Sequence, residues 1–224
     1  MSQFYYKRHM SVPYNSRPIS IGDGLEAYPL PVKCTVIGDC SVGKTSLLIS
    51  YTTGAFSTQY VPTIFDNYHK EVICDGILVD LELSDTAGLE DKRRIRSMSY
   101  LETDVFVVCF SIVSPKSFHN VVDKWIPEIK ECLPNKPFIL VGTKCDLRTN
   151  NDILNELHLN NDKPIDRLTG QRCAARLGAV KYLECSADTK LGVNQIFDES
   201  VRKALEMLAY RPVKHKSLIT CCIS

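Results

Sequence analysis

The eight residues from Gly38 to Thr45 read G-D-C-S-V-G-K-T and fit the phosphate-loop pattern G-x-x-x-x-G-K-[ST]. The apolar stretch Val32–Ile37 precedes them, and a helix-like run, Thr45–Tyr51, follows. In this strand–loop–helix context, successive backbone N–H groups and the helix N-terminus face an anion. The motif therefore requires a strand that passes through this loop into a helix, and it predicts binding of a nucleoside triphosphate.

Each part of the loop has an expected task. Gly38 and Gly43 allow tight turns and a close approach of the backbone to phosphate. Lys44 is expected to reach the β- and γ-phosphates, and the Thr45 hydroxyl is expected to bind Mg²⁺. The expected phosphate-side residues are Gly38, Asp39, Cys40, Ser41, Val42, Gly43, Lys44, Thr45 and Ser46.

Apolar runs alternate with helical patterns along the middle of the chain, which is typical of an α/β fold with a mostly parallel sheet covered on both faces. The expected strands are Cys34–Ile37, Glu71–Cys74, Leu78–Leu83, Val105–Phe110, Phe138–Val141 and Val180–Leu183. The expected helices are Thr45–Tyr51, Pro115–Cys132, Leu168–Leu177 and Asn194–Leu208. Asp75-Gly76 predicts a hairpin between the second and third strands. The nucleotide should lie at the carboxyl ends of the strands.

The length of 224 residues suits one domain with flanking segments. We expect a flexible N-terminal extension over 1–30, a nucleotide-binding domain over 31–208 with a surface insertion at about 150–163, and a flexible tail over 209–224. The net charge of +1 gives no global field for nucleic acid. The N-terminal segment has no apolar core of a signal peptide, and no apolar run is long enough to span a membrane.

The ten cysteines follow neither a disulfide framework nor paired zinc-ligand spacing. Four of them lie in or beside apolar strands and are expected to be reduced core residues, as in a cytosolic protein: Cys34, Cys74, Cys109 and Cys185.

The segment Thr143-Lys144-Cys145-Asp146 helps to decide the base, because a phosphate loop alone is shared by kinases, ATPases and GTPases. The Asp146 carboxylate can accept hydrogen bonds from N1–H and the 2-amino group of guanine, a pair of donors that adenine lacks. Lys144 is long enough to lie across the base. The backbone of Ser186-Ala187 can donate to guanine O6. Taken alone, Asp146 is equally well read as an ordinary charged strand end.

Asp85-Thr86-Ala87-Gly88 ends another expected strand. Asp85 is suited to hold Mg²⁺ through water, and the Gly88 N–H to approach the γ-phosphate. Upstream, Thr63 can supply a second hydroxyl to the metal. Phe56 is expected to pack against the base, although an exposed loop aromatic explains it almost as well. Loops of this kind become ordered when the γ-phosphate is present, which makes the molecule a switch.

These motifs, in this order, resemble a small GTPase of the Rho family, closest to its Rac-like and cell-division-control-like members. The resemblance spans about 32–208 and includes Ile49–Thr53, Phe65–Tyr68, Lys181–Ala187 and the insertion. It implies a six-stranded P-loop G domain, GTP or GDP with Mg²⁺, and effectors that act on actin organisation, cell polarity or membrane traffic. It also implies exchange factors and activating proteins as partners. The effector-binding residues that it implies are Thr63, Phe65, Asp66 and Tyr68.

Two residues at the expected site of hydrolysis differ from those usual in the family. Among the catalytic positions that the resemblance implies, Lys44, Thr63 and Gly88 are kept, but Leu89 replaces the glutamine that orients the attacking water. Leucine has no donor or acceptor for that task. Cys40 replaces a glycine and projects toward the γ-phosphate and the space for an activator's arginine. A related GTPase hydrolyses GTP at about 10⁻⁴ s⁻¹ and gains about 10⁵-fold from its activator. We expect most of that gain to be lost, unless neighbouring residues compensate.

Two further departures concern regulators. Ser84 replaces a bulky aromatic side chain at a position that exchange factors read in this family. The run Lys92-Arg93-Arg94-Ile95-Arg96 is more basic than its counterpart. It is expected either to alter the choice of regulators or to form a solvated helix face.

The last four residues, Cys221-Cys222-Ile223-Ser224, fit a C-a-a-X prenylation signal with Cys221 as acceptor. One lipid gives only reversible membrane binding, so a second signal is needed. Palmitoylation of Cys222 is one candidate, and the basic residues Arg211, Lys214 and Lys216 are the other. We expect a lipid-anchored protein on the cytoplasmic face of the plasma membrane or an endomembrane, with a cytosolic pool.

Overall fold

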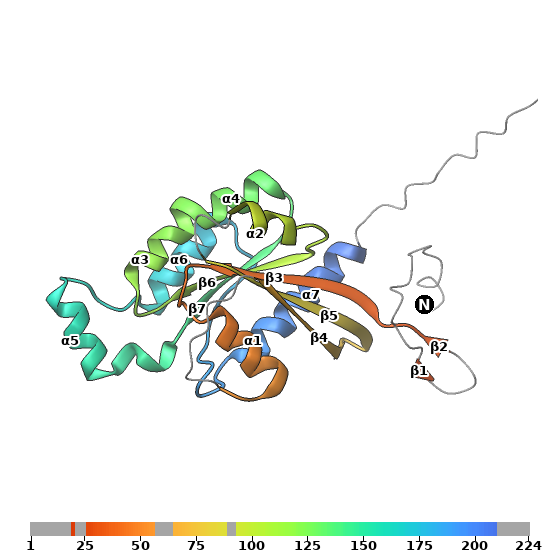
Figure 1. The fold of residues 1–224 in the computed structure, drawn as a ribbon, viewed down its shortest axis with the longest axis horizontal. Coiled ribbons are helices and arrows are strands. Elements are labelled where there is room, and N and C mark those ends of the chain that lie inside the picture. Colours follow the sequence, from red (N-terminus) through yellow and green to blue (C-terminus); the bar gives the residue numbers. More distant parts are fainter. Residues whose placement is uncertain (1–18, 21–25, 57–64, 89–92, 210–224) are drawn as a thin grey trace, which may run out of the picture.

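The computed structural model describes residues 19–20, 26–56, 65–88 and 93–209. Its centre is a six-stranded sheet with the order β4-β5-β3-β6-β7-β8, and only the β4–β5 pair is antiparallel (Figure 1). The expected α/β fold with a six-stranded, mostly parallel sheet is confirmed. The strands are β3 (Leu30–Gly38), β4 (Phe65–Cys74), β5 (Ile77–Thr86), β6 (Val105–Ser111), β7 (Phe138–Thr143) and β8 (Tyr182–Glu184).

Helices cover both faces of this sheet, with α1 and α7 on one side and α2, α3, α4 and α6 on the other (Figure 1). Alternate residues of β6 point into two separate cores: Val105, Val107 and Cys109 toward α1 and α7, and Phe106 and Val108 toward α3 and α4. The helices are α1 (Lys44–Thr53), α2 (Arg93–Ser99), α3 (Pro115–Asn120), α4 (Ile126–Cys132), α5 (Asn151–Leu159), α6 (Arg167–Leu177) and α7 (Val193–Ala209).

The sequence predicts most of these helices but not all of their details. The insertion contains α5, which begins at an Asn150 cap whose side chain accepts from the backbone N–H groups of Asp152 and Ile153. The single helix expected over 115–132 is interrupted by a π-helical segment, η2 (Val121–Trp125). The short 3₁₀ segment η3 (Cys145–Thr149) was not expected, and a helix at α2 was considered only as one reading of the basic run.

The hairpin predicted from Asp75-Gly76 is present. Cys74 pairs with Ile77, and both turn residues have positive φ, 50° for Asp75 and 78° for Gly76. Two successive left-handed residues form the type I′ geometry that matches the twist of the strands. This turn places the antiparallel strand β4 at the edge of the sheet.

The described part of the expected N-terminal extension contains a two-residue strand pair, β1 (Ile19–Ser20) with β2 (Glu26–Ala27). The four cysteines expected in the core are buried and carry free thiols. Burial raises the pKa of Cys109 to about 12, so that this thiol stays protonated. Among the helices that the structure describes, none combines the length and the apolar character needed to cross a bilayer.

Candidate nucleotide site

Four loops at the carboxyl ends of β3, β5, β7 and β8 carry the predicted motifs, which places these loops at one end of the sheet. The phosphate loop leaves β3 at Gly38 and enters α1 at Lys44. Gly38 has a φ of 144°, and a Cβ there would lie 2.2 Å from the backbone oxygen of Cys109. Only glycine fits this contact between the loop and β6.

Lys44 folds back across the phosphate loop. Its Nζ donates hydrogen bonds to the carbonyl oxygens of Gly38, at 2.9 Å, and Asp39, at 2.8 Å. Burial lowers the pKa of Lys44, and the nearby Asp85 carboxylate opposes that shift. The Lys44 ammonium is thus held inside the loop, where the negative charge of an incoming phosphate would stabilise its charged form.

The metal-side residues lie together where β5 meets α1. The Thr45 hydroxyl donates to the Asp85 carboxylate, with 2.5 Å between the two oxygens, and Asp85 is fully buried. A hydroxyl and a carboxylate are hard oxygen ligands, and Mg²⁺ commonly takes few protein ligands beside substrate phosphates and water. This donor set therefore fits Mg²⁺. Thr63, the third expected ligand, lies outside the described residues.

The base-side motifs are joined to the phosphate loop by side chains. The Thr143 hydroxyl donates to the Val42 carbonyl oxygen at 2.5 Å, and Lys144 Nζ donates to the Ser41 carbonyl oxygen at 2.8 Å. Lys144 itself has a left-handed backbone, with a φ of 57°. The hydrogen bond from Nζ makes the Lys144 side chain a bridge between the two loops.

The second base loop, after β8, is anchored to α1 and to the first base loop. Ser50 donates its hydroxyl to the Ala187 carbonyl oxygen at 2.9 Å, and the Cys145 N–H donates to the Cys185 carbonyl oxygen at 3.0 Å. Phe56, which was expected to contact the base, follows α1 and has 42% of its surface exposed.

Gly88 lies directly against the phosphate loop. A Cβ at this position would lie 2.3 Å from the backbone nitrogen of Cys40, so no larger residue fits without displacement of the loop. The Cys40 residue is half-buried. Leu89 lies outside the described residues. The structure thus places Gly88 and Cys40 side by side, at the position where the sequence predicts the γ-phosphate.

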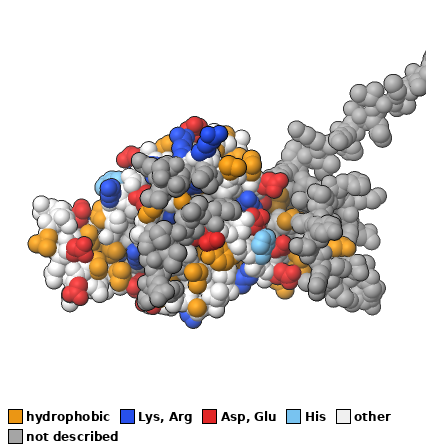
Figure 2. Space-filling view, viewed as in Figure 1, with side chains coloured by type: hydrophobic (Ala, Val, Ile, Leu, Met, Phe, Trp, Pro, Cys, Tyr) orange, Lys and Arg blue, Asp and Glu red, His pale blue; other side chains and the backbone are white. Residues whose placement is uncertain are grey.

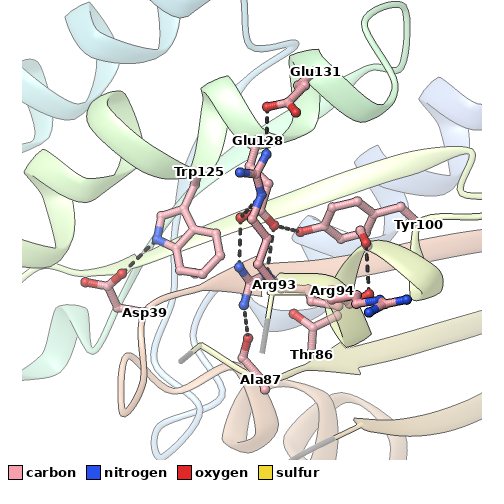
Figure 3. Close-up of polar contacts among 12 residues, drawn as sticks. Asp39, Thr86, Ala87, Arg93, Arg94, Tyr100, Trp125, Glu128 and Glu131 are labelled. Carbon is pink, nitrogen blue, oxygen red and sulfur yellow. Dashed lines mark hydrogen bonds and ion pairs between the residues drawn. The ribbon is translucent and has the colours of Figure 1, made fainter. Parts of the chain in front are cut away.

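The basic run lies mostly within α2, where Arg93 and Arg94 are exposed, as a solvated helix face predicts, but Arg96 is not. The side chain of Arg96 is fully buried and makes a two-bond contact with Glu128 of α4, at 2.8 and 2.7 Å. Tyr100 donates to the same carboxylate at 2.6 Å (Figure 3). Arg93 is exposed and pairs with Glu131 at 2.6 Å. Figure 2 shows basic and acidic side chains adjacent on the surface above α2.

Arg96 also orients the peptide that precedes Gly88. Its Nη1 donates to the Ala87 carbonyl oxygen at 2.9 Å. In a planar trans peptide the C=O and the following N–H point in opposite directions. The bond from Arg96 therefore directs the N–H of Gly88 away from α4.

The Asp39 side chain, expected on the phosphate side, instead accepts hydrogen bonds from Trp125 Nε1, at 2.8 Å, and Asn120 Nδ2, at 2.6 Å. The guanidinium of Arg96 lies 4.7 Å from the centre of the Trp125 ring. Trp125 thus connects the phosphate loop to α2. The sequence analysis did not identify this contact, because 86 positions separate the two residues.

Ser84, which was considered for its place in exchange-factor recognition, is fully buried and donates its hydroxyl to Asn67 Oδ1 at 2.9 Å. In this structure the short side chain forms a cross-strand bond between β5 and β4.

The buried pair predicts a large loss of stability for Glu128→Ala. Removal of one partner leaves the Arg96 charge buried, which costs about 3–5 kcal/mol. Burial alone would raise the pKa of Glu128, but the hydrogen bonds from Arg96 and Tyr100 outweigh it and lower this pKa. A lowered carboxylate pKa gives stability that is present above the unfolded-state value and lost as the pH falls through the folded-state value.

Urea unfolding of the wild type and of Glu128→Ala measures this effect. Glu131→Ala is the matched control, because it breaks an exposed ion pair, which contributes little to stability. The wild type should lose more stability than Glu128→Ala as the pH falls below the ordinary glutamate range. Equal losses for the two alanine variants at neutral pH would contradict the buried pair.

The model of the Ras family matches residues 33–206, which is most of the chain and includes the four loops described above. The chain therefore belongs to the Ras family of small GTPases, which bind guanine nucleotides and hydrolyse GTP.

Proposed function

We propose that this chain is a Rho-type GTPase that binds GTP and Mg²⁺ in the usual way but hydrolyses GTP slowly, so that it remains GTP-loaded. The Rho-type assignment is supported by the motif stretches described above and by the insertion with α5 between β7 and α6. The slow hydrolysis is supported by Cys40 and Leu89. The observation that carries it is the half-buried Cys40 side chain in the phosphate loop, beside Gly88, where the sequence predicts the γ-phosphate.

The residues that hold the substrate are intact, whereas those that assist water attack are changed. Lys44 supplies a positive charge to the phosphates, and Mg²⁺ held by Thr45 and Asp85 would neutralise charge on the transferred group. A glutamine at position 89 would orient the attacking water, and leucine cannot form that hydrogen bond. At position 40, a thiol-bearing side chain occupies space that a glycine leaves for an activator's arginine.

The proposed partners are effector proteins and exchange factors, with a weak response to activating proteins. Asp66 is exposed on the edge strand β4, and Tyr68 is half-buried against the core, so both have stable positions from which to contact an effector. The Phe65 backbone lies in β4. Effectors in actin organisation, polarity or membrane traffic follow from the resemblance. Prenylation of Cys221, with Cys222 or the basic tail residues as second signal, would place the protein on a membrane.

The alternative function is a conventional switch that cycles between GTP and GDP under exchange and activating factors. It is favoured by the intact metal-side pair Thr45 and Asp85 and by Gly88, which a nucleotide-dependent switch needs. Both functions use the same fold and the same nucleotide, and they differ only in the rate of hydrolysis.

A single-turnover experiment distinguishes these functions. Protein loaded with labelled GTP is mixed with Mg²⁺, with or without a Rho-type activating protein, and GDP formation is followed. We expect the activator to add less than about 100-fold to the intrinsic rate, against about 10⁵-fold for a related GTPase. The nucleotide found in freshly purified protein should be mainly GTP. A full activator response, with mainly GDP in the purified protein, would establish the cycling switch instead.

A further inference from the structure

A partly buried ion pair joins the two loops that carry the base-recognition motifs. Arg148 donates two hydrogen bonds to the Glu184 carboxylate, Nη2 to Oε1 at 2.6 Å and Nη1 to Oε2 at 3.0 Å. The Glu184 side chain is 8% exposed and the Arg148 side chain 30%. A paired contact of this kind fixes both the distance and the relative orientation of the two groups.

Both partners are sequence neighbours of the base-reading residues. Arg148 lies in η3, two residues after Asp146. Glu184 ends β8, two residues before Ser186. The ion pair therefore sets the separation between the loop with the Asp146 carboxylate and the loop with the Ser186-Ala187 backbone.

The Glu184 carboxylate is held in place from the side of β8. Tyr182 donates its hydroxyl to Glu184 Oε1 at 2.8 Å. The Tyr182 ring lies against Gly170, where a Cβ would come within 2.3 Å of Cζ, and its hydroxyl lies against Gly142, where a Cβ would come within 2.7 Å. Burial, with a smaller contribution from Glu184, raises the pKa of Tyr182, so that the phenol remains a protonated donor.

Arg148 is held from the opposite side as well. Its Nη2 also donates to the Ile165 carbonyl oxygen at 3.2 Å, and the Ile165 N–H donates to the Ile112 carbonyl oxygen at 2.9 Å. The guanidinium thus connects η3 with the segment that follows α5. The contacts of both partners leave little freedom for the pair to shift.

Guanine recognition depends on this separation. Asp146 must accept from N1–H and the 2-amino group while a backbone N–H of the other loop donates to O6 of the same base. Hydrogen bonds weaken steeply when their distance or angle is distorted. Two loops that move apart cannot satisfy both edges of one rigid base at the same time.

We propose that Arg148 and Glu184 are positioning residues for guanine recognition, which hold the Asp146 loop and the Ser186-Ala187 loop at the spacing of one guanine base. This inference rests on the guanine-nucleotide binding included in the proposed function, but not on slow hydrolysis. It assigns to the pair a function in base selection beyond a contribution to folding stability.

The test compares two nucleotides that differ by a single group. Inosine diphosphate lacks the 2-amino group of GDP, so the ratio of the two affinities measures how well Asp146 reads the base. Arg148→Met and Glu184→Gln each weaken the charged hydrogen bonds between the two residues, and such bonds contribute strongly. In both variants we expect GDP to dissociate about tenfold faster. We also expect the preference for GDP over inosine diphosphate to fall at least about threefold. Arg148→Lys should give intermediate values, because lysine cannot make the paired contact.

The matched control is Lys181→Met. Lys181 directly precedes β8, and its Nζ forms an exposed ion pair with Glu199 Oε1 at 2.7 Å. This variant should leave the nucleotide preference unchanged. Thermal unfolding identifies variants that do not fold, and the isosteric Glu184→Gln variant keeps the test decisive if Arg148→Met is one of them. An unchanged preference in folded Glu184→Gln overturns the proposal, even if GDP dissociates faster. If the wild type binds neither nucleotide, both this proposal and the proposed function are refuted. If the wild type hydrolyses GTP fast, the proposed function alone is refuted.

Discussion

Replacement of Cys40 by glycine and Leu89 by glutamine in one chain is expected to raise activator-stimulated GTP hydrolysis at least about 10³-fold. The physical reason is that the double variant regains both the space for an activator's arginine and a side chain that orients water. In a related GTPase the arginine alone contributes about 10³–10⁵-fold. A factor of 10³ corresponds to about 4 kcal/mol of barrier lowering.

Single-turnover rates of the wild type, both single variants and the double variant measure this gain. Each single variant should recover only a small part, because the two groups act on the same transition state and their effects are not additive. Cys132→Ser is the control for thiol removal, since Cys132 is an exposed residue of α4. A double variant no faster than the wild type would show that another feature limits hydrolysis.

Lys44→Met is expected to weaken GDP binding by at least about 100-fold. Methionine keeps the apolar stem but removes the ammonium that lies within the loop, and loss of one partner of a buried charge pair costs about 2–5 kcal/mol or more. The structure supports the assignment because Lys44 Nζ already lies between two carbonyl oxygens of the phosphate loop. Isothermal titration with GDP measures the change.

Lys70→Met is the matched control for this substitution. Lys70 Nζ also donates to a main-chain carbonyl oxygen, that of Tyr51 at 2.7 Å, but it does so outside the nucleotide loops. The control should bind GDP as the wild type does. Similar losses in both variants would mean that Lys44 acts through folding and not through contact with phosphate.

The strands and the nucleotide motifs were predictable because their signals are local. Apolar runs mark the strands, and two turn residues mark the hairpin. The phosphate-loop pattern itself fixes the spacing of its residues. Asp85, Asp146 and Ser186 each follow an apolar run, so the sequence places them at the ends of strands. The expected site residues in the described segments lie at the loops where the sequence places them, except that the Asp39 side chain turns toward Trp125.

The buried polar contacts were not predictable, because each joins residues far apart in sequence. Arg96 reads as a surface charge in a short basic helix, and only the fold brings Glu128, 32 positions later, to its guanidinium. The Asp39–Trp125 bond spans 86 positions. The π-helical segment leaves no mark in the apolar pattern of 115–132. Tertiary contacts decided these features, and local propensity carries no information about them.

The strand order also determines when the nucleotide site can form as the chain folds. In the six-stranded sheet, only β4 and β5 are joined by a two-residue turn, whereas the other neighbouring strands are parallel and are connected through long crossovers. Parallel pairs form late because the entropy of closing their loops must be overcome first. The base loops complete the site only once β8 has joined β7 at the sheet edge. Since nucleotide binds this finished state and not the unfolded chain, bound nucleotide adds its binding free energy to the stability of the fold. A chain that keeps its nucleotide is therefore also a chain that resists unfolding, and its lifetime in the cell should follow its occupancy.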